Sequence, residues 1–439
     1  MKILFISLGC DKNLVDSEMM MGLLRDKGYE FTDDEALADV IVINTCGFIN
    51  DAKEESINTI ISMAEYKEHN LKALIVTGCL AERYKDEILD ELPEIDAIIG
   101  TTAFDTIVNV IDDVLANKKH NEFADINSLC RPNVDRIITT GGYYSYLKIA
   151  EGCNKKCTYC SIPFIRGKYR SVPMEDLIKE AQYLADNGIK ELILVAQETS
   201  VYGIDLYGEK RLPMLLNKLC EVKGIEWIRL LYCYPEEITD ELIGTIKAQP
   251  KICHYIDMPI QHASDNILKR MGRWTNKEAL ISVINRLRNA IPDMCIRTTL
   301  ITGFPGETLE DHEELMEFVD EMEFDRLGVF TYSQEEDTAA AGFDNQVEEE
   351  VKLTRRDELM ELQQEISMDK AQGLIGRTLE VIIEGVATDE DVYVGRTYMD
   401  APGVDGYIFI KSEEELMSGD FAKVKVTGAM EYDLIGELC

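Results

Sequence analysis

The chain has 439 residues, which at about 150 residues per domain suggests three domains. Hydrophobic residues make up 46% of the chain, so it is globular rather than disordered. It has 45 Lys and Arg against 82 Asp and Glu, a net charge of −37, which weighs against a nucleic-acid partner and favours a basic one.

The sequence contains no apolar run that approaches the length of a membrane span, so we expect no membrane partner. The apolar start MKILFISLGC is too short for a signal peptide, and the polar DKN that follows it is typical of a loop after a strand. We therefore expect a cytoplasmic protein with reduced cysteines. In such a protein, grouped cysteines indicate metal binding or catalysis rather than disulfides.

Strands and helices alternate over residues 1–118. Each predicted strand is a near-continuous apolar run followed by a helical stretch, which is typical of strands covered on both faces. The predicted strands are KILFISLG (2–9), VIVINTC (40–46), ALIVTGC (73–79) and AIIG (97–100). This pattern predicts an α/β domain with a doubly wound parallel sheet.

A polar, Pro-containing linker is expected over residues 119–136, before a second α/β series and helical connector over residues 137–370. Its predicted strands are YLKIAEG (146–152), ELILVAQ (191–197), WIRLLYC (227–233), YIDMPIQ (255–261), CIRTTLI (295–301) and RLGVFTY (326–332). Six such units predict a partial (β/α)6 barrel, whose active site would lie at the carboxyl ends of the strands. The tail, residues 371–439, has short alternating strands with Gly-bearing turns and predicts a small antiparallel, OB-like barrel.

The most specific motif is CNKKCTYC, which follows the first strand of the second series. It contains Cys153, Cys157 and Cys160, the barrel cysteines. Three thiolates in one loop can hold three irons of a 4Fe–4S cluster and leave the fourth iron open. Structural zinc sites prefer four ligands, so zinc fits this loop poorly. The spacing resembles the radical S-adenosylmethionine (SAM) superfamily, in which the open iron binds SAM.

A second group comprises Cys10, Cys46 and Cys79, the N-terminal cysteines. Each stands at the carboxyl end of a predicted strand, so the three should converge at one edge of a parallel sheet. Gly9, Gly47 and Gly78 adjoin them and allow close backbone approach. Three converging thiolates predict a second open-iron cluster, although a single such cysteine would usually be a small buried hydrophobe.

The remaining six cysteines show no such pattern, and we assign them no chemistry. Four are predicted to be core residues, one lies in the linker and one at the end of the chain: Cys220, Cys233, Cys253, Cys295, Cys130 and Cys439.

An iron–sulfur α/β domain, a radical-SAM barrel and a small β-barrel together resemble the methylthiotransferase family, with a tail similar to its TRAM module. LGCDKNLVDSEMM resembles the RimO-type branch rather than the MiaB-type branch, which has a sequence near GCQMN. Further RimO-like segments are AEGCNKKCTYCSIPFIRGKYRS, LVAQETSVYG, DMPIQHASDNILKRMGR, RTTLITGFPGET and EYDLIGE. The chain departs from the family at Asp11, where Pro is usual, and at TAAA (338–341), where TPA is usual.

The resemblance implies methylthio transfer to the β-carbon of an aspartate in small-subunit ribosomal protein twelve. It implies two 4Fe–4S clusters, two SAM molecules per turnover and an external electron donor. The barrel cysteines would hold the cluster that cleaves SAM to a 5′-deoxyadenosyl radical. The N-terminal cysteines would hold the cluster that carries the sulfur.

Other residues are candidates for binding SAM because they lie in the cysteine loop or near the carboxyl ends of barrel strands. They are Tyr159, Gln197, Glu198, Gln261, His262, Arg297, Thr299 and Gly303. Each has a structural alternative, such as a loop aromatic, a strand-end cap or a buried histidine. The basic residues Arg166, Lys168 and Arg170 could meet a carboxylate of SAM or substrate, or be solvated loop charges.

The tail has five Lys and Arg against fourteen Asp and Glu, a net charge of −9. An acidic tail suits a basic ribosomal protein, met on the ribosome or its small subunit, better than RNA. The alternative with the same chemistry is a tRNA adenosine methylthiotransferase of the MiaB type, which would need a basic surface. Alternatives of other classes are an iron–sulfur electron carrier, which normally has four cysteines per cluster, and a zinc-binding interaction protein.

Overall fold

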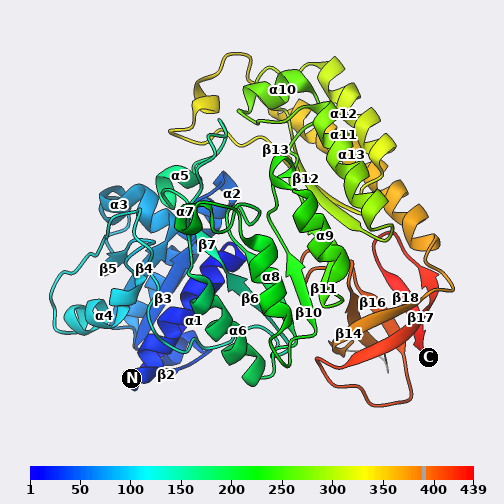
Figure 1. Ribbon diagram of the computed structural model, residues 1–439. Coiled ribbons are helices and arrows are strands. Elements are labelled where there is room, and N and C mark those ends of the chain that lie inside the picture. Colours follow the sequence, from blue (N-terminus) through cyan, green and yellow to red (C-terminus); the bar gives the residue numbers. More distant parts are fainter. Residues whose placement is uncertain (388–391) are drawn as a thin grey trace.

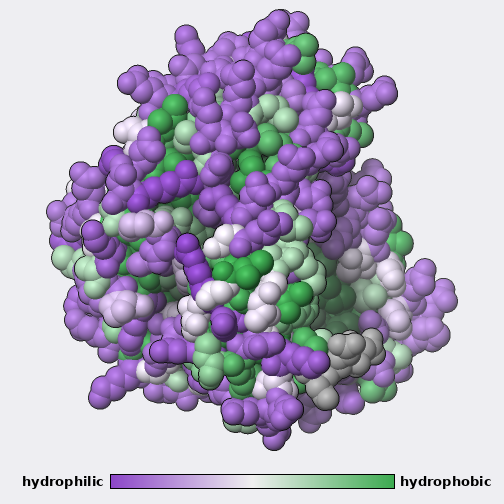
Figure 2. Space-filling model, turned by 90° about the vertical axis from the view of Figure 1, so that its right-hand side faces the viewer, coloured by the Kyte–Doolittle hydropathy of each residue, from purple (hydrophilic) through white to green (hydrophobic). Residues whose placement is uncertain are grey.

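The computed structural model describes residues 1–387 and 392–439. A central barrel lies between an N-terminal sheet domain and a small C-terminal barrel (Figure 1). Hydrophilic side chains cover most of the face seen in Figure 2, as the acidic composition suggests. Within the described residues, none of the helices is long and apolar enough to span a membrane.

The N-terminal domain is built on a parallel sheet with strand order β2-β1-β3-β4-β5. Its strands are β1 (Lys2–Ser7), β2 (Glu30–Phe31), β3 (Val40–Thr45), β4 (Ala73–Gly78) and β5 (Ala97–Ile99). Its helices are α1 (Asp11–Asp26), α2 (Asn50–Ala64), α3 (Cys79–Glu91) and α4 (Ile107–Leu115). The two-residue edge strand β2 was not predicted, because it has no apolar run.

Strand β3 shows why the apolar runs are continuous. All its residues are buried. Val40 and Val42 pack in the cluster that contains α1 and α4, whereas Ile41 and Ile43 pack in the cluster that contains α2 and α3. Helices therefore cover both faces, and the predicted doubly wound sheet is confirmed.

The central sheet has the order β13-β12-β11-β10-β9-β6, with all neighbours parallel. Its strands are β6 (Tyr144–Lys148), β9 (Glu191–Val195), β10 (Trp227–Leu230), β11 (Ile252–Asp257), β12 (Cys295–Thr302) and β13 (Arg326–Thr331). Its longer helices are α6 (Met174–Asp186), α8 (Leu212–Cys220), α9 (Asp240–Ala248), α11 (Lys277–Ala290), α12 (Leu309–Met322) and α13 (Glu349–Gln372). Because β6 and β13 are the two edges of this sheet, the barrel is open, which confirms the predicted partial barrel.

Shorter elements surround the mouth of this barrel. They are α5 (Ile162–Ile165), α7 (Ile204–Tyr207), α10 (Asp265–Arg270), β7 (Ala150–Glu151) and β8 (Arg170–Ser171). The first predicted barrel strand ends earlier than expected, at Lys148, because Ala150 and Glu151 pair antiparallel with β8 instead. This pairing closes the base of the loop that carries the barrel cysteines.

The C-terminal strands form a closed barrel with the order β14-β15-β16-β18-β17. They are β14 (Thr378–Val386), β15 (Val392–Thr397), β16 (Ile408–Lys411), β17 (Phe421–Ala429) and β18 (Leu434–Leu438). The pairing of β16 with β18 is parallel, and the other pairings are antiparallel. The expected small OB-like barrel is therefore present, with one parallel pair that alternation alone does not reveal.

The C-terminal barrel packs against the amino ends of the central strands. Glu191, the first residue of β9, is paired with Arg229 of β10 and Arg396 of β15. On the other side, helix α1 packs against β6. The cysteine loop lies near the carboxyl ends of the central strands, where the N-terminal domain also makes contact through Lys53 and Arg83 with Glu335 after β13. The domain boundaries that we expect at residues 118, 136 and 370 stay predictions.

Candidate functional site

The N-terminal cysteines follow three adjacent strands. Cys46 and Cys79 come directly after β3 and β4, and Cys10 comes three residues after the end of β1. These strands are neighbours in the parallel sheet, so their carboxyl ends lie side by side. All twelve cysteines of the chain are free thiols.

Glycines let the backbones of these three turns approach one another. Gly9 has φ +84°, and a Cβ placed on it would lie 2.8 Å from the Cβ of Cys46. Gly78 has φ +94°, and a Cβ there would lie 2.5 Å from the carbonyl oxygen of Thr45. A larger residue at either position would push the cysteine turns apart.

Asn13 ties the three turns together from the first turn of α1. Its side-chain nitrogen donates to the carbonyl oxygens of Leu8 and Thr45, both at 3.0 Å. Its side-chain oxygen lies 3.7 Å from the sulfur of Cys79. Asn13 was not among the predicted site residues, although it lies only three residues after Cys10.

Burial makes the thiols of Cys46 and Cys79 hard to ionise alone. It raises the pKa of Cys46 to about 12, with a further contribution from the nearby Cys79, and it also raises the pKa of Cys79. A coordinated metal deprotonates a thiol outright, because the cation compensates the thiolate charge. The converging thiols therefore fit an iron–sulfur cluster.

The barrel cysteines lie in a loop between β7 and α5. Thr158 anchors the loop through its amide nitrogen and hydroxyl, which donate to the carbonyl oxygens of Met271 at 2.9 Å and Arg270 at 2.8 Å. Burial raises the pKa of Cys153 to about 12, and it raises the pKa of Cys160 further. This loop therefore holds three buried or half-buried thiols together, which fits a cluster.

Across residues 1–387 and 392–439, no three His, Cys, Asp or Glu side chains are arranged to hold a single metal ion. A 4Fe–4S cluster is larger than one ion, so its ligands need not converge on one point.

Gln197 and Glu198 lie just beyond the carboxyl end of β9, and each has a buried side-chain oxygen without a hydrogen-bond partner. Burial raises the pKa of Glu198 to about 7, although the ammonium group of Lys155 lies 3.7 Å away. Buried polar atoms that lack a partner need one, and SAM offers hydroxyl and amino groups. This part of the barrel therefore fits SAM.

Arg273, which was not among the predicted site residues, lies beside the loop that carries the barrel cysteines. It is buried, and its Nε and Nη1 atoms have no partner. Its guanidinium lies 4.3 Å from the ring centroid of Tyr234. Tyr159, one of the predicted SAM residues, makes an edge-to-face contact with Phe304, with the ring centroids 6.5 Å apart.

Gln261 and His262 lie beyond the carboxyl end of β11. His262 is fully buried, and its Nδ1 accepts a hydrogen bond from the amide of Ser264 at 2.9 Å. Its Nε2 lies 3.7 Å from a carboxylate oxygen of Glu307. Among the described residues, its Nε2 has no hydrogen-bond partner, so His262 stays a candidate for binding SAM. Gln261 has φ +72°, and its backbone bonds to both Thr299 and Ile301.

The predicted residues on and after β12 have different surroundings. The guanidinium of Arg297 pairs with Asp257 at 2.8 Å and with Asp405 of the C-terminal domain at 3.3 Å. Thr299, on the same strand, is half-buried. Gly303 has φ +70°, and a Cβ there would lie 2.2 Å from a side-chain carbon of Lys352. The packing of α13 therefore requires a glycine at position 303.

The basic loop residues also differ in place. Arg166 is buried against Asp16 of α1 at 2.8 Å, so it does not meet solvent. Lys168 is exposed. Arg170 is half-buried and donates to the backbone carbonyl oxygens of Lys168 and Arg166.

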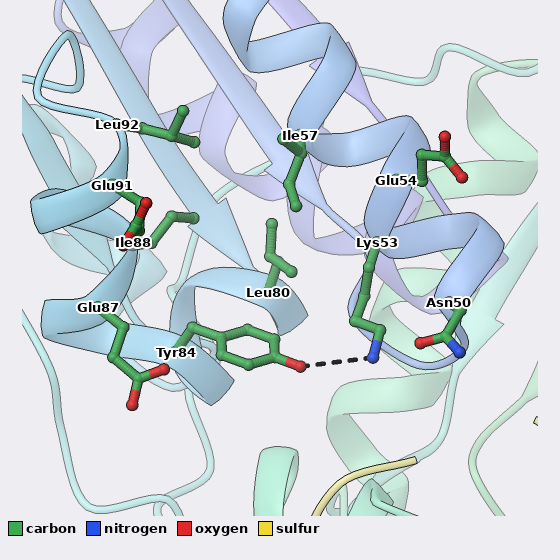
Figure 3. A pocket seen from close by; sticks show the side chains of 10 residues that line it. All are labelled: Asn50, Lys53, Glu54, Ile57, Leu80, Tyr84, Glu87, Ile88, Glu91 and Leu92. Carbon is green, nitrogen blue, oxygen red and sulfur yellow. Dashed lines mark hydrogen bonds between the residues drawn. The ribbon is translucent and has the colours of Figure 1, made fainter. Parts of the chain in front are cut away.

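A separate pocket of about 590 Å³ opens between α2 and α3 (Figure 3). The amine of Lys53 points toward the hydroxyl of Tyr84, at 3.4 Å, across one end of the pocket. Its lining residues include none of the cysteines or predicted SAM residues. We therefore give this pocket no part in the chemistry.

Comparison with known proteins agrees with this architecture. Residues 2–100 match the profile of the uncharacterized protein family UPF0004, residues 147–319 match the radical SAM superfamily and residues 375–439 match the TRAM domain. Among solved structures, the fold is similar to the radical SAM methyltransferase TsrM of Kitasatospora setae, with a TM-score of 0.56 and 13% identity over 75% of this chain and 74% of that chain. It is also similar to the cobalamin-dependent SAM radical enzyme OxsB, with a TM-score of 0.51 and 13% identity over 82% of this chain and 56% of that chain.

Curated relatives match over the whole length. The chain is 63% identical to the ribosomal protein uS12 methylthiotransferase RimO of Lachnoclostridium phytofermentans, over 99% of both chains. It is 52% identical to the protein of that name from Clostridioides difficile, over 100% of this chain and 99% of that one. The three matched segments and this identity lead to one assignment: the chain belongs to the RimO methylthiotransferase family of radical SAM enzymes.

Proposed function

We propose that this enzyme transfers a methylthio group to the β-carbon of an aspartate in ribosomal protein uS12. One observation carries the proposal: the chain brings together two separate groups of three buried or half-buried cysteines, one at the edge of a sheet and one at the mouth of the barrel. Replacing an unactivated C–H bond requires both a radical and a sulfur donor. Two open-iron clusters match these two tasks.

When bound, the clusters and two SAM molecules per turnover would supply a 5′-deoxyadenosyl radical at the barrel and a methylated sulfur at the sheet edge. The barrel cysteines would hold one cluster and the N-terminal cysteines the other. The orphaned oxygens of Gln197 and Glu198 would accept hydrogen bonds from SAM. The free nitrogens of Arg273 would donate to its carboxylate. Tyr159 would lie beside the adenine ring.

Contacts between the two domains would hold the sites in register. Helix α1 begins immediately after Cys10 and packs against β6, the strand that leads to the barrel cysteines. The hydroxyl of Tyr232 donates to Asp11 at 3.1 Å, which joins the end of β10 to the first turn of α1. A fixed distance between radical and sulfur donor favours transfer over side reactions.

The proposed partner is uS12 on the ribosome or its small subunit, with an external electron donor, and therefore in the cytoplasm. The net charge of −37 supports a basic protein partner, because opposite charges steer encounter and like charges repel phosphate. No observation on this structure favours tRNA.

The experiment offers anaerobically reconstituted enzyme both uS12 and bulk tRNA, with SAM, sulfide and a reductant, and follows both by mass spectrometry. We expect a methylthio gain on one aspartate of uS12 and none on tRNA. A gain on tRNA adenosine would overturn the substrate. Formation of 5′-deoxyadenosine without either gain would overturn the substrate class while keeping the radical chemistry.

A further inference from the structure

Arg166 lies in the central barrel domain, six residues after Cys160, but its side chain reaches the N-terminal cysteines. Its Nη2 atom lies 3.5 Å from the sulfur of Cys79. The same nitrogen donates to the side-chain oxygen of Asn13, the residue that ties the three cysteine turns together. The residue is only 2% exposed.

Two carboxylates fix the guanidinium in this position. Its Nη1 atom donates to Asp16 at 2.8 Å and to Glu151 at 3.2 Å. Lys148 is bound to the same two carboxylates and, within the described part of the chain, to no cysteine. Because a guanidinium is rigid and always charged, the donor stays aimed at the sulfur.

We propose that Arg166 donates a hydrogen bond to the sulfur of Cys79 and thereby raises the reduction potential of the N-terminal cluster. This inference rests on the proposed function, which places a cluster there. Reduction adds negative charge to a cluster and its sulfur ligands, so a nearby cation and donor stabilise the reduced form. Burial strengthens the effect, since little water screens it.

The consequence is a link between the two cysteine sites. Arg166 stands next to Cys79 at 3.5 Å, with its charge inside the domain interface. It is a positioning residue, because it acts through the ligand and does not touch substrate. Its place just after the cysteine loop also makes the environment of one cluster depend on the loop that holds the other.

The test uses the full chain with the three barrel cysteines replaced by Ala, so that only the N-terminal cluster is assembled. The midpoint potential is measured by dithionite titration followed by electron paramagnetic resonance. Arg166→Met should shift the potential to a lower value, and Arg166→Lys should recover part of the shift. The matched control is Lys148→Arg, which keeps the charge of the same cluster of side chains and should leave the potential unchanged.

Equal potentials in the parent and Arg166→Met chains would overturn the inference. If Arg166→Met fails to fold, Arg166→Lys decides, because it keeps the charge but removes the nitrogen near Cys79. An unchanged potential in Arg166→Lys would then overturn the inference. A parent chain that binds no iron when the barrel cysteines are absent would instead overturn the proposed second cluster. Measuring the iron content distinguishes an unchanged potential from a missing cluster.

Discussion

Replacing Glu191 with Ala should separate the central and C-terminal barrels at much lower denaturant concentration. The carboxylate is fully buried. One oxygen accepts from Nε of Arg229 at 2.7 Å and the other from Nη2 of Arg396 at 2.6 Å. The substitution leaves two buried guanidiniums without their shared counter-charge. Breaking a buried ion pair from one side costs about 3–5 kcal/mol.

A loss of about 4 kcal/mol, with a urea dependence of about 2 kcal/mol per M, lowers the transition midpoint by about 2 M. Tryptophan fluorescence can follow this transition. Trp227 is buried at the interface and lies 5.0 Å from the ring of Phe421 in the C-terminal barrel. Trp274, the other tryptophan, is 82% exposed and gives a nearly constant signal. Unfolding of the interface should therefore shift the fluorescence of Trp227 alone.

The matched control is Glu380→Ala, an exposed carboxylate on β14. A surface change of this kind should alter stability by less than about 0.5 kcal/mol. If Glu191→Ala lowered the midpoint by no more than this control, the buried network would not hold the barrels together, and the reasoning would be refuted.

Three further outcomes follow from the same geometry. Replacing the N-terminal cysteines by Ala should abolish methylthio transfer to uS12 while SAM cleavage to 5′-deoxyadenosine survives; persistence of both would exclude a sulfur-donor role. Gly78→Ala should reduce reconstituted iron to about half, since its Cβ would strike the backbone of Thr45, the residue before Cys46, whereas Gly244→Ala, with open space around it, should not; equal iron in both would contradict this. Arg396 and Arg229 hold the pKa of Glu191 below its usual 4.5, so its contribution to stability is present above pH 4.5 and is lost as pH falls through the lower folded pKa. The urea midpoint of the parent should therefore fall on acidification below pH 4.5 more steeply than that of Glu191→Gln, and parallel curves would argue against this coupling.

Much of the fold could be predicted because its signals are local. The run VIVI (40–43) is apolar because helices cover both faces of β3, and such runs are typical of parallel strands. The same logic placed Cys46 and Cys79 at adjacent strand ends. A cysteine directly after a buried strand has only one edge of the sheet to occupy.

Side-chain direction could not be predicted in the same way. Arg297 and Arg166 are both basic residues near the expected SAM site, but each is neutralised by carboxylates that lie far away in sequence. Arg297 pairs with Asp405 of the C-terminal barrel, and Arg166 pairs with Asp16 of α1. Which domain a long side chain joins depends on how the domains pack, and no local pattern records that packing.

The departure at Asp11 shows what such packing adds. The sequence marks it only as an unusual residue beside Cys10, but here its carboxylate accepts a hydrogen bond from Tyr232 at 3.1 Å. The ammonium of Lys12 lies 3.5 Å from the centroid of the same ring. Tyr232 has φ +58°, a conformation that costs a residue with a side chain about 1 kcal/mol or more. A proline in place of Asp11 has no side chain that could accept this bond. Asp11 therefore helps to hold a strained residue of the barrel against the turn that carries Cys10, and so helps to fix one cysteine site relative to the other.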